Sequence, residues 1–211
     1  MRPGRGAANM PRRPAPTFSD WDGVAYRATS YDVPLWVNPN RRSGRWNIAG
    51  RRCTQYLSLD SETPFAEALR HEDLRTPEAA SHYSTTIWQL QVRDGAIVDY
   101  SNFELAEAAG FEAEALIEDD HERCQAEAQW LFDKGARGIL CPSAALPGST
   151  NLTLFGPRVS VAWNTTTSLA SAVPAQKLAT GHPPAGLTER VRYFGQPEPL
   201  LVEYLGASGN D

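Results

Sequence analysis

The 211-residue sequence lacks any apolar run close to the roughly 20 residues that a membrane-spanning helix needs. It has only three cysteines, without paired spacing, and so does not carry the disulfide framework of a small secreted protein. A reducing cytoplasm is the simplest location for such a chain, and we expect a cytoplasmic protein. Positive charge is not in excess either. The net charge of −5 makes nonspecific binding to duplex nucleic acid unfavourable.

Several common catalytic motifs are absent as well. The chain has no Gly-x-Ser-x-Gly elbow, no phosphate loop ending in Gly-Lys-Ser/Thr and no Gly-x-Gly-x-x-Gly. The four histidines have no metal-ligand spacing, so we expect no metal site. His121 and Cys124 have no second ligand pair nearby, and we interpret Cys124 as core and His121 as helix surface. Proton transfer and nucleophilic attack in this chain are therefore expected mainly from carboxylates, tyrosine and serine.

What the chain does have is enough apolar material for a folded domain. The hydrophobic fraction is 41%, with six tryptophans, and the length suits one domain. The first 17 residues carry four arginines, four prolines and no acid. We therefore predict a disordered basic leader over residues 1–19, a catalytic domain over 20–190 and a tail of unassigned role over 191–211.

Local patterns predict an α+β fold, with mixed sheets and flanking helices. Alternation of apolar and polar side chains favours strands at residues 25–28, 54–59, 86–92, 138–141 and 159–163, with a further short one over 95–100. A helix is expected over residues 64–72, and two helical pieces over 102–117, broken at Gly110. Another helix contains Cys124 and ends at Gly135.

The stretch from Gly44 to Glu72 joins a strand directly to a helix. Tyr56 lies on the more polar face of the strand, and Asp60 with Pro64 is typical of a helix start. We therefore expect Tyr56 and Glu67 at the same end of the sheet. The pattern alone leaves a plainer interpretation open, in which Tyr56 is a half-buried strand aromatic and Glu67 pairs with Arg70 or His71 on the helix surface.

Three arginines fall within the five residues from Arg41 to Arg45, next to Gly44. Backbone N–H groups and guanidinium groups in such a segment can bind a phosphate. A solvated basic loop is the alternative. Trp46 favours the phosphate site slightly, because its indole can hold the Arg45 guanidinium by stacking.

Several separated motifs together resemble the RES-domain family, which is named after an Arg, a Glu and a Ser. We assign these to Arg45, Glu67 and Ser143. The resemblance runs from about residue 26 to residue 163. The motifs, in chain order, are Tyr26-Arg27, Gly44-Arg45-Trp46-Asn47, Tyr56-Leu57, the Glu67 helix, and Pro142-Ser143-Ala144 with Pro147 and Asn151.

The resemblance implies a bacterial toxin of a two-gene toxin–antitoxin module, with a fold similar to ADP-ribosyltransferases. Such toxins attack NAD⁺ at the nicotinamide–ribose bond, and phosphate, water or a protein accepts the ADP-ribosyl group. The implied partner is an antitoxin with an Xre-like DNA-binding region that covers the active site. No cofactor is implied beyond NAD⁺ as substrate, with inorganic phosphate as a co-substrate in some members.

The resemblance also implies roles for particular residues. Glu67, Arg45, Tyr56 and Ser143 would be catalytic, with the Glu67 carboxylate stabilising the positive charge that develops on the ribose. Bound NAD⁺ would contact six residues. The pyrophosphate would meet Arg27 and Arg45, the nicotinamide and ribose would meet Tyr56, and Trp46, Ser143 and Asn151 would complete the binding set.

Two further functions stay open from the sequence. One is a protein mono-ADP-ribosyltransferase, because a protein side chain approaches the same ribose carbon as water or phosphate does. The other is a catalytically inert RES-like domain that binds only a nucleotide or a partner protein. The presence of Arg45, Tyr56, Glu67 and Ser143 together favours an enzyme.

Overall fold

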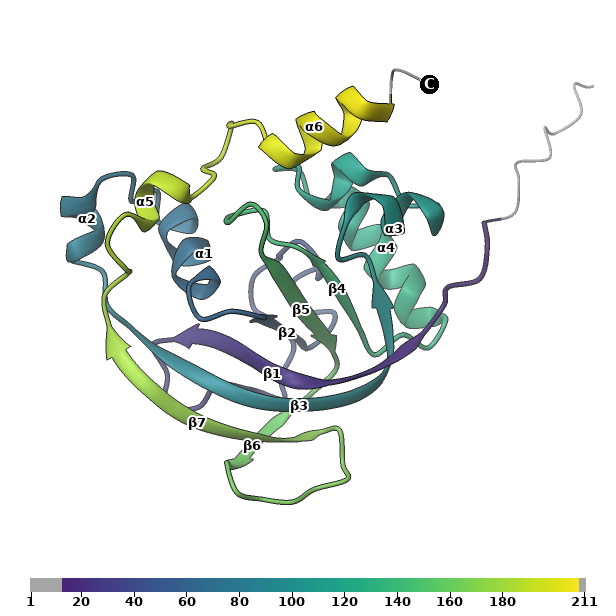
Figure 1. Ribbon diagram of the computed structural model, residues 1–211. Coiled ribbons are helices and arrows are strands. Elements are labelled where there is room, and N and C mark those ends of the chain that lie inside the picture. Colours follow the sequence, from purple (N-terminus) through teal and green to yellow (C-terminus); the bar gives the residue numbers. More distant parts are fainter. Residues whose placement is uncertain (1–12, 209–211) are drawn as a thin grey trace, which may run out of the picture.

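A seven-stranded sheet is the frame of the molecule, in the strand order β1-β2-β5-β4-β3-β7-β6. The computed structural model describes residues 13–208 (Figure 1). The strands are β1 (Ser19–Thr29), β2 (Thr54–Ser58), β3 (Thr85–Asp99), β4 (Gly138–Pro142), β5 (Thr150–Phe155), β6 (Val159–Ala162) and β7 (Ala172–Gly181). This mixture of strands and flanking helices confirms the α+β class.

Strand β3 belongs to both halves of this sheet. Most of its length pairs antiparallel with β1 on one edge and with β7 on the other. Its last part, residues 97–99, pairs in parallel with β4. Because β1 also pairs with β2, the contacts among β1, β2, β5, β4 and β3 close into a ring. Figure 1 shows the long strands β1, β3 and β7 curving beneath the shorter β2, β5 and β4.

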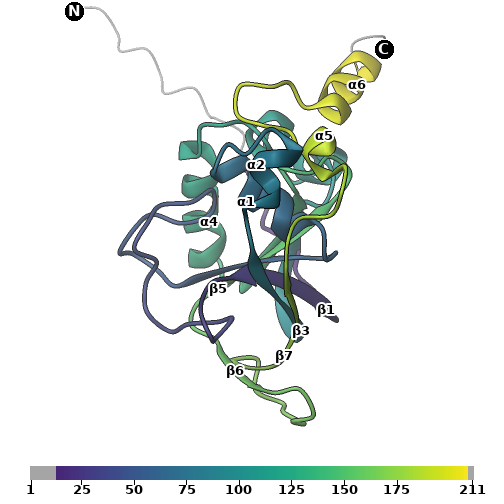
Figure 2. The ribbon, with the colours of Figure 1, turned by 90° about the vertical axis from the view of Figure 1, so that its left-hand side faces the viewer.

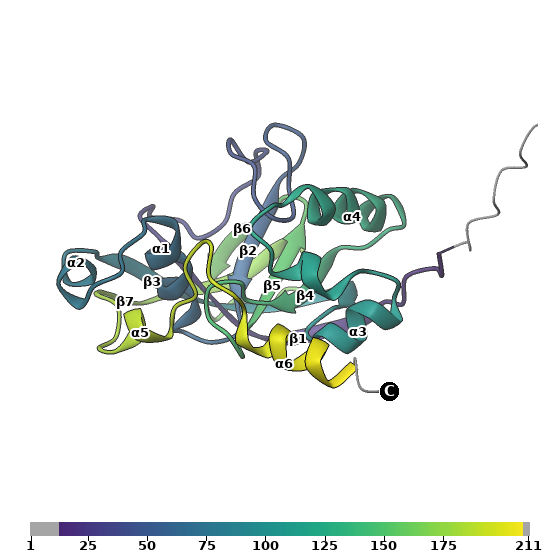
Figure 3. The ribbon, with the colours of Figure 1, turned by 90° about the horizontal axis from the view of Figure 1, so that it is seen from above.

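Helices cover the sheet in two groups. Helices α1 (Thr63–His71), α2 (Pro77–Ser81) and α5 (Leu187–Arg190) lie together over one end (Figure 2). Helices α3 (Phe103–Ala108), α4 (Glu122–Asp133) and α6 (Pro199–Ser208), with the 3₁₀ turn η1 (Ala113–Leu116), lie over the other (Figure 3). Each group packs on its own cluster of buried apolar side chains. The space between the two groups is where the site lies.

Helix α1 begins within a few residues of the end of β2, and Asp60 binds its first residue. The Asp60 carboxylate accepts hydrogen bonds from the Thr63 N–H at 2.8 Å and the Thr63 hydroxyl at 2.6 Å. Pro64 occupies the first turn, where its missing N–H costs nothing. As expected, the strand-to-helix connection brings Tyr56 and Glu67 to the same end of the sheet.

The predicted strands are all present, but the sheet contains more. The expected strands at 86–92 and 95–100 are one strand, β3, which continues through Ala96 at a positive φ of 54°. Residues 159–163 were expected to form the final strand, and β7 follows them. Its apolar side chains are interrupted by Pro174 and Gln176, so alternation is weak there. A loop over residues 163–171 joins β6 to β7, far from the helices (Figure 1).

The packed chain extends beyond the limits expected at residues 20 and 190. Residues 1–12 of the predicted leader lie outside the described residues. Arg13, the first described residue, packs against the folded domain. Its guanidinium donates to the buried Glu127 carboxylate and lies 4.0 Å from the Trp130 ring centroid. In the predicted tail, Val191 and Tyr193 are buried. Within residues 13–208, no helix combines the length and apolar character needed to cross a membrane.

Candidate active site

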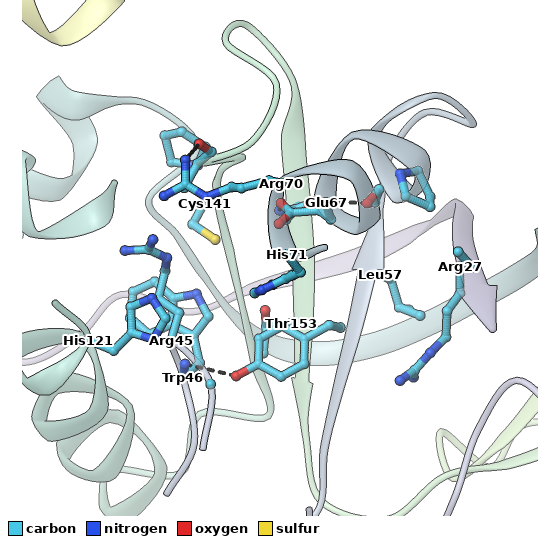
Figure 4. Close-up of a pocket in the computed structure, with 18 of the residues that line it drawn as sticks. Arg27, Arg45, Trp46, Leu57, Glu67, Arg70, His71, His121, Cys141 and Thr153 are labelled. Atoms are coloured by element: carbon cyan, nitrogen blue, oxygen red, sulfur yellow. Dashed lines mark hydrogen bonds between the residues drawn. The ribbon is translucent and has the colours of Figure 1, made fainter. Parts of the chain in front are cut away.

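A pocket of about 330 Å³ opens between α1, the ends of β1, β2 and β5, and the loop that precedes β2. That volume is typical of a small-molecule site. Arg27, Arg45, Tyr56, Glu67 and Asn151 all line it, although they come from five separate parts of the chain. Figure 4 shows the Glu67 carboxylate and the Arg45 guanidinium on either side of the space, and Arg27 farther out beyond Leu57.

Glu67 is held by one of its two carboxylate oxygens. Oε1 accepts a hydrogen bond from the Ser143 hydroxyl and another from the Asn151 amide, each 2.8 Å long. Among the described residues, no hydrogen bond reaches Oε2 and no ion pair joins Glu67 to Arg70 or His71. The helix-surface interpretation of Glu67 is therefore wrong. Its carboxylate is fixed in direction and keeps one oxygen for a ligand.

Ser143 lies behind Glu67 rather than in the pocket wall. It is 1% exposed, and its hydroxyl oxygen accepts the N–H groups of Ala145 and Leu146 at 3.1 Å while donating to Glu67. Asn151 is oriented in turn by the Ser58 hydroxyl, which donates to its amide oxygen at 2.8 Å. Both groups are thus occupied in holding the carboxylate.

Tyr56 fastens the loop of residues 40–52, here called the Arg45 loop. Its hydroxyl accepts the Trp46 N–H at 2.9 Å and donates to the Asn47 side-chain oxygen at 2.8 Å. Burial raises the pKa of Tyr56 well above its usual range, so the phenol stays protonated. A Cβ at Gly44 would lie 2.7 Å from the Tyr56 hydroxyl, which explains the glycine. The ring of Tyr56, rather than its hydroxyl, remains available to a ligand.

Arg45 is held by the backbone of η1 and of the residues that follow it. Its guanidinium donates to the Glu118 carbonyl at 2.8 Å and the Ala115 carbonyl at 3.4 Å. No described aromatic ring stacks on it. The expected stacking on Trp46 is wrong because that indole is only 1% exposed and packs in the core near Phe111, at a centroid distance of 6.3 Å.

Arg27 is a buried cation without a carboxylate partner among the described residues. Its guanidinium lies 3.8 Å from the Trp36 ring centroid and donates to the Gln55 side-chain oxygen at 2.9 Å. Burial lowers the pKa of Arg27 to about 9, which still leaves it charged at neutral pH. A buried charge is costly unless it is paired, so this one favours an anionic ligand.

The sequence missed several residues of the pocket. Arg70, His71 and Phe194 line it, as does His121, so the interpretation of His121 as helix surface is wrong. Burial and the neighbouring Arg45, His71 and Arg70 lower the pKa of His121 to about 4, which makes it neutral at pH 7. Arg70 and His71 follow Glu67 by three and four positions, a spacing that pointed to the same helix face. Cys124 is buried in the core, as expected.

Comparison with known proteins identifies what this arrangement resembles. The family model of the RES domain matches residues 17–172. A chain in the crystal structure of the M. tuberculosis MbcT–MbcA toxin–antitoxin complex has a similar fold, with a TM-score of 0.60 and 21% identity. The match covers 83% of this chain and 91% of that one. No curated protein sequence matches.

Proposed function

The chain belongs to the RES domain family, and from that premise we propose that it is an enzyme that cleaves the nicotinamide–ribose bond of NAD⁺. We further propose that it acts as the toxin of a toxin–antitoxin module. One observation carries the enzymatic proposal. The Glu67 carboxylate is fixed by Ser143 and Asn151, with its second oxygen unbonded by the described residues, in a pocket that also presents arginines.

The chemistry of the bond suits a fixed carboxylate. Nicotinamide leaves as a neutral group, so positive charge develops on the ribose at the anomeric carbon. A carboxylate facing that carbon, or holding a ribose hydroxyl beside it, stabilises charge that exists mainly in the transition state. Two hydrogen bonds on Oε1 hold Glu67 in place before the reaction, so little reorganisation is needed during it.

The two pocket arginines suit the pyrophosphate of NAD⁺. Arg27 carries a buried charge without a described counter-ion, and Arg45 reaches the same space from the opposite side. Phosphate oxygens match the planar donors of guanidinium groups. Tyr56 offers its ring face to the nicotinamide or ribose, since its hydroxyl already has two partners. We propose NAD⁺ as the substrate and no further cofactor.

The test is nicotinamide release from NAD⁺ by the purified full-length chain, with and without inorganic phosphate. Attack by water yields ADP-ribose, attack by phosphate yields ADP-ribose 1″-phosphate, and attack by a protein side chain leaves ADP-ribose on protein. Mass spectrometry separates the three products. We expect release of free nicotinamide with one of the first two. Absence of both turnover and NAD⁺ binding would refute the proposal.

The proposed partner is an antitoxin protein with an Xre-like DNA-binding region. Its support is family membership, together with the structural neighbour, whose crystal structure is that of a toxin–antitoxin complex. An antitoxin that covers the pocket mouth would block NAD⁺ directly. The net charge of −5 makes nucleic acid an unfavourable direct target for this chain.

A further inference from the structure

The chain from residue 191 to 196, here called the 191–196 segment, reaches the pocket although the RES match ends at residue 172. Its residues Arg192 and Tyr193 are buried, and the Tyr193 hydroxyl donates to the Leu74 carbonyl at 2.7 Å. Phe194 lines the pocket, with its ring centroid 4.2 Å from the Arg70 guanidinium carbon. The segment therefore contributes Phe194 to the wall of the site.

Arg192 binds the loop of residues 143–149, here called the Ser143 loop, through both its backbone and its side chain. Its N–H donates to the Ala145 carbonyl at 2.8 Å. Its guanidinium donates to the Ala144 carbonyl at 3.2 Å and to the Ile117 carbonyl at 2.9 Å. Arg70 donates to the same Ala144 carbonyl and to the Arg192 carbonyl, at 2.7 Å each. Two guanidinium groups thus hold one peptide carbonyl.

Asp119 is the counter-ion of both arginines. Its Oδ1 accepts from Arg70 and lies 3.5 Å from Nη2 of Arg192, while its Oδ2 accepts the Gly195 N–H at 2.7 Å. The side chains of Arg70 and Arg192 are 2% and 7% exposed. An unpaired buried charge is costly, so these ion pairs and hydrogen bonds favour the observed geometry of the cluster.

The Ser143 loop connects the arginine cluster to Glu67 through hydrogen bonds. The Ser143 hydroxyl oxygen accepts the N–H groups of Ala145 and Leu146, and its proton is donated to Glu67. The peptides that Arg192 holds are therefore the ones that set the direction of the Ser143 hydroxyl. A displacement of about 1 Å at a reacting centre can cost up to about 100-fold in rate.

We propose that Arg192 is a positioning residue for Glu67, acting through the Ser143 loop. The functional unit then extends to the 191–196 segment, beyond the part of the chain that matches the family. The kinetic readout of this inference rests on the proposed NAD⁺ cleavage. Its structural readout, the hydrogen exchange of the loop amides, does not.

The test compares Arg192→Lys with Arg190→Lys in the full-length chain. Lysine at 192 keeps the positive charge but not the planar donors that reach Ala144, Ile117 and Gln196. Arg190, two residues away, forms only an exposed ion pair with Glu62 and is the matched control. For Arg192→Lys we expect faster exchange of the Ala145 and Leu146 amides, a kcat at least about 10-fold lower, and a KM within about threefold of wild type.

A double variant separates positioning from general destabilisation. In a Glu67→Gln background, Arg192→Lys should cause little further loss of kcat, because the carboxylate that it positions is already gone. Equal exchange of the loop amides in Arg192→Lys and wild type would overturn the inference, as would a full further loss in the double variant. If Arg192→Lys does not fold, Asp119→Asn should give the same pattern in milder form. An inactive wild type with the expected exchange result would refute NAD⁺ cleavage but leave the positioning role standing.

Discussion

At the scale of single residues, the site depends on groups whose hydrogen bonds are already made before a ligand arrives. Ser143 and Asn151 donate hydrogen bonds to Glu67, and the Tyr56 hydroxyl is hydrogen-bonded to the Arg45 loop. The second oxygen of Glu67, the Tyr56 ring and the arginines are among the groups that can still meet a ligand. Substitutions of these groups should separate binding from chemistry.

Glu67→Gln should abolish most NAD⁺ turnover while leaving NAD⁺ binding and thermal stability nearly unchanged. The glutamine side-chain oxygen can still accept from Ser143 and Asn151, so only the charge is lost. Loss of one electrostatic group that faces the transition state costs about 3–4 kcal/mol, or roughly 10²–10³ in kcat. Nicotinamide release and calorimetric titration with NAD⁺ measure the two quantities. Glu72→Gln, at the exposed end of α1, is the control, and release at the wild-type rate from Glu67→Gln would remove the carboxylate from the mechanism.

Arg45→Ala should behave differently, with most of its effect in binding. The pyrophosphate carries its charge both before and during the reaction, so the lost contact is common to the ground state and the transition state. We expect a higher dissociation constant for both NAD⁺ and ADP-ribose, measured by calorimetry, with a smaller change in kcat. Arg51→Ala, an exposed position on the same loop outside the pocket wall, should leave both constants near wild type.

His121 should make the folded protein less stable as the pH falls from about 6.5 to about 4. Its pKa is about 4 in the folded protein, against an ordinary value of 6.5. In that window the unfolded chain binds a proton that the folded chain does not, so acidification favours unfolding. Thermal unfolding between pH 4 and pH 7 should show a shallower decline for His121→Gln than for wild type. His82→Gln, at an exposed position, is the matched control.

At the scale of structural elements, hydrogen bonds hold the Arg45 loop against β2 and the 191–196 segment against the Ser143 loop. The Arg45 loop folds back on itself, since the Gly50 N–H donates to the Asn40 carbonyl at 2.9 Å. Tyr56 joins that loop to β2. The position of Arg45 at the pocket therefore depends on a residue of the sheet.

Tyr56→Phe should loosen the Arg45 loop while keeping the aromatic ring. The change leaves the Trp46 N–H and the Asn47 side-chain oxygen without their partner, which costs about 1–3 kcal/mol of unfolding free energy. Denaturant unfolding measures this loss, and titration with NAD⁺ should show weaker binding because Arg45 is less fixed. Unchanged stability together with unchanged binding would show that the hydroxyl does not hold the loop.

Local sequence patterns predicted the placement of Tyr56 with Glu67 at the centre of the site, but they did not predict β7 or the role of Arg192. Asp60 and Pro64 mark the start of α1, and that alone brings Tyr56 and Glu67 together. By contrast, β7 is held by pairing with β3 and β6, partners distant in the sequence, and its own alternation is weak. Arg192 was unpredictable for a related reason. Its partners are mostly backbone carbonyls, which no residue pattern reveals.

At the scale of the whole molecule, unpaired positive charge is concentrated on one part of the chain. The described arginines that form no ion pair with a carboxylate all lie between residues 27 and 52, namely Arg27, Arg41, Arg42, Arg45, Arg51 and Arg52. The chain as a whole is acidic, with a net charge of −5. Two of these arginines, Arg27 and Arg45, line the pocket, which is thus suited to an anionic substrate.

Expression of the chain alone in bacteria should arrest growth and lower cellular NAD⁺, because nothing would then cover the pocket. Co-expression with the product of an adjacent Xre-like gene should restore both. The Glu67→Gln variant, expressed to the same soluble level, is the control and should be harmless. Healthy growth with undiminished NAD⁺ in cells that contain soluble wild-type protein would count against the toxin proposal. The NAD⁺ content of cell extracts is the direct measurement.

The exposed loop of residues 163–171, between β6 and β7, has a practical consequence. A chain cut there yields a first fragment that carries Glu67 and Ser143 and a second that carries β7, Arg192 and Phe194. Neither fragment holds a complete site, and the pairing of β7 with β3 and β6 would guide their reassembly. Fused to two proteins that associate on a signal, the halves would form a complete site only while the two proteins are together, and the proposed NAD⁺ cleavage would then depend on that signal.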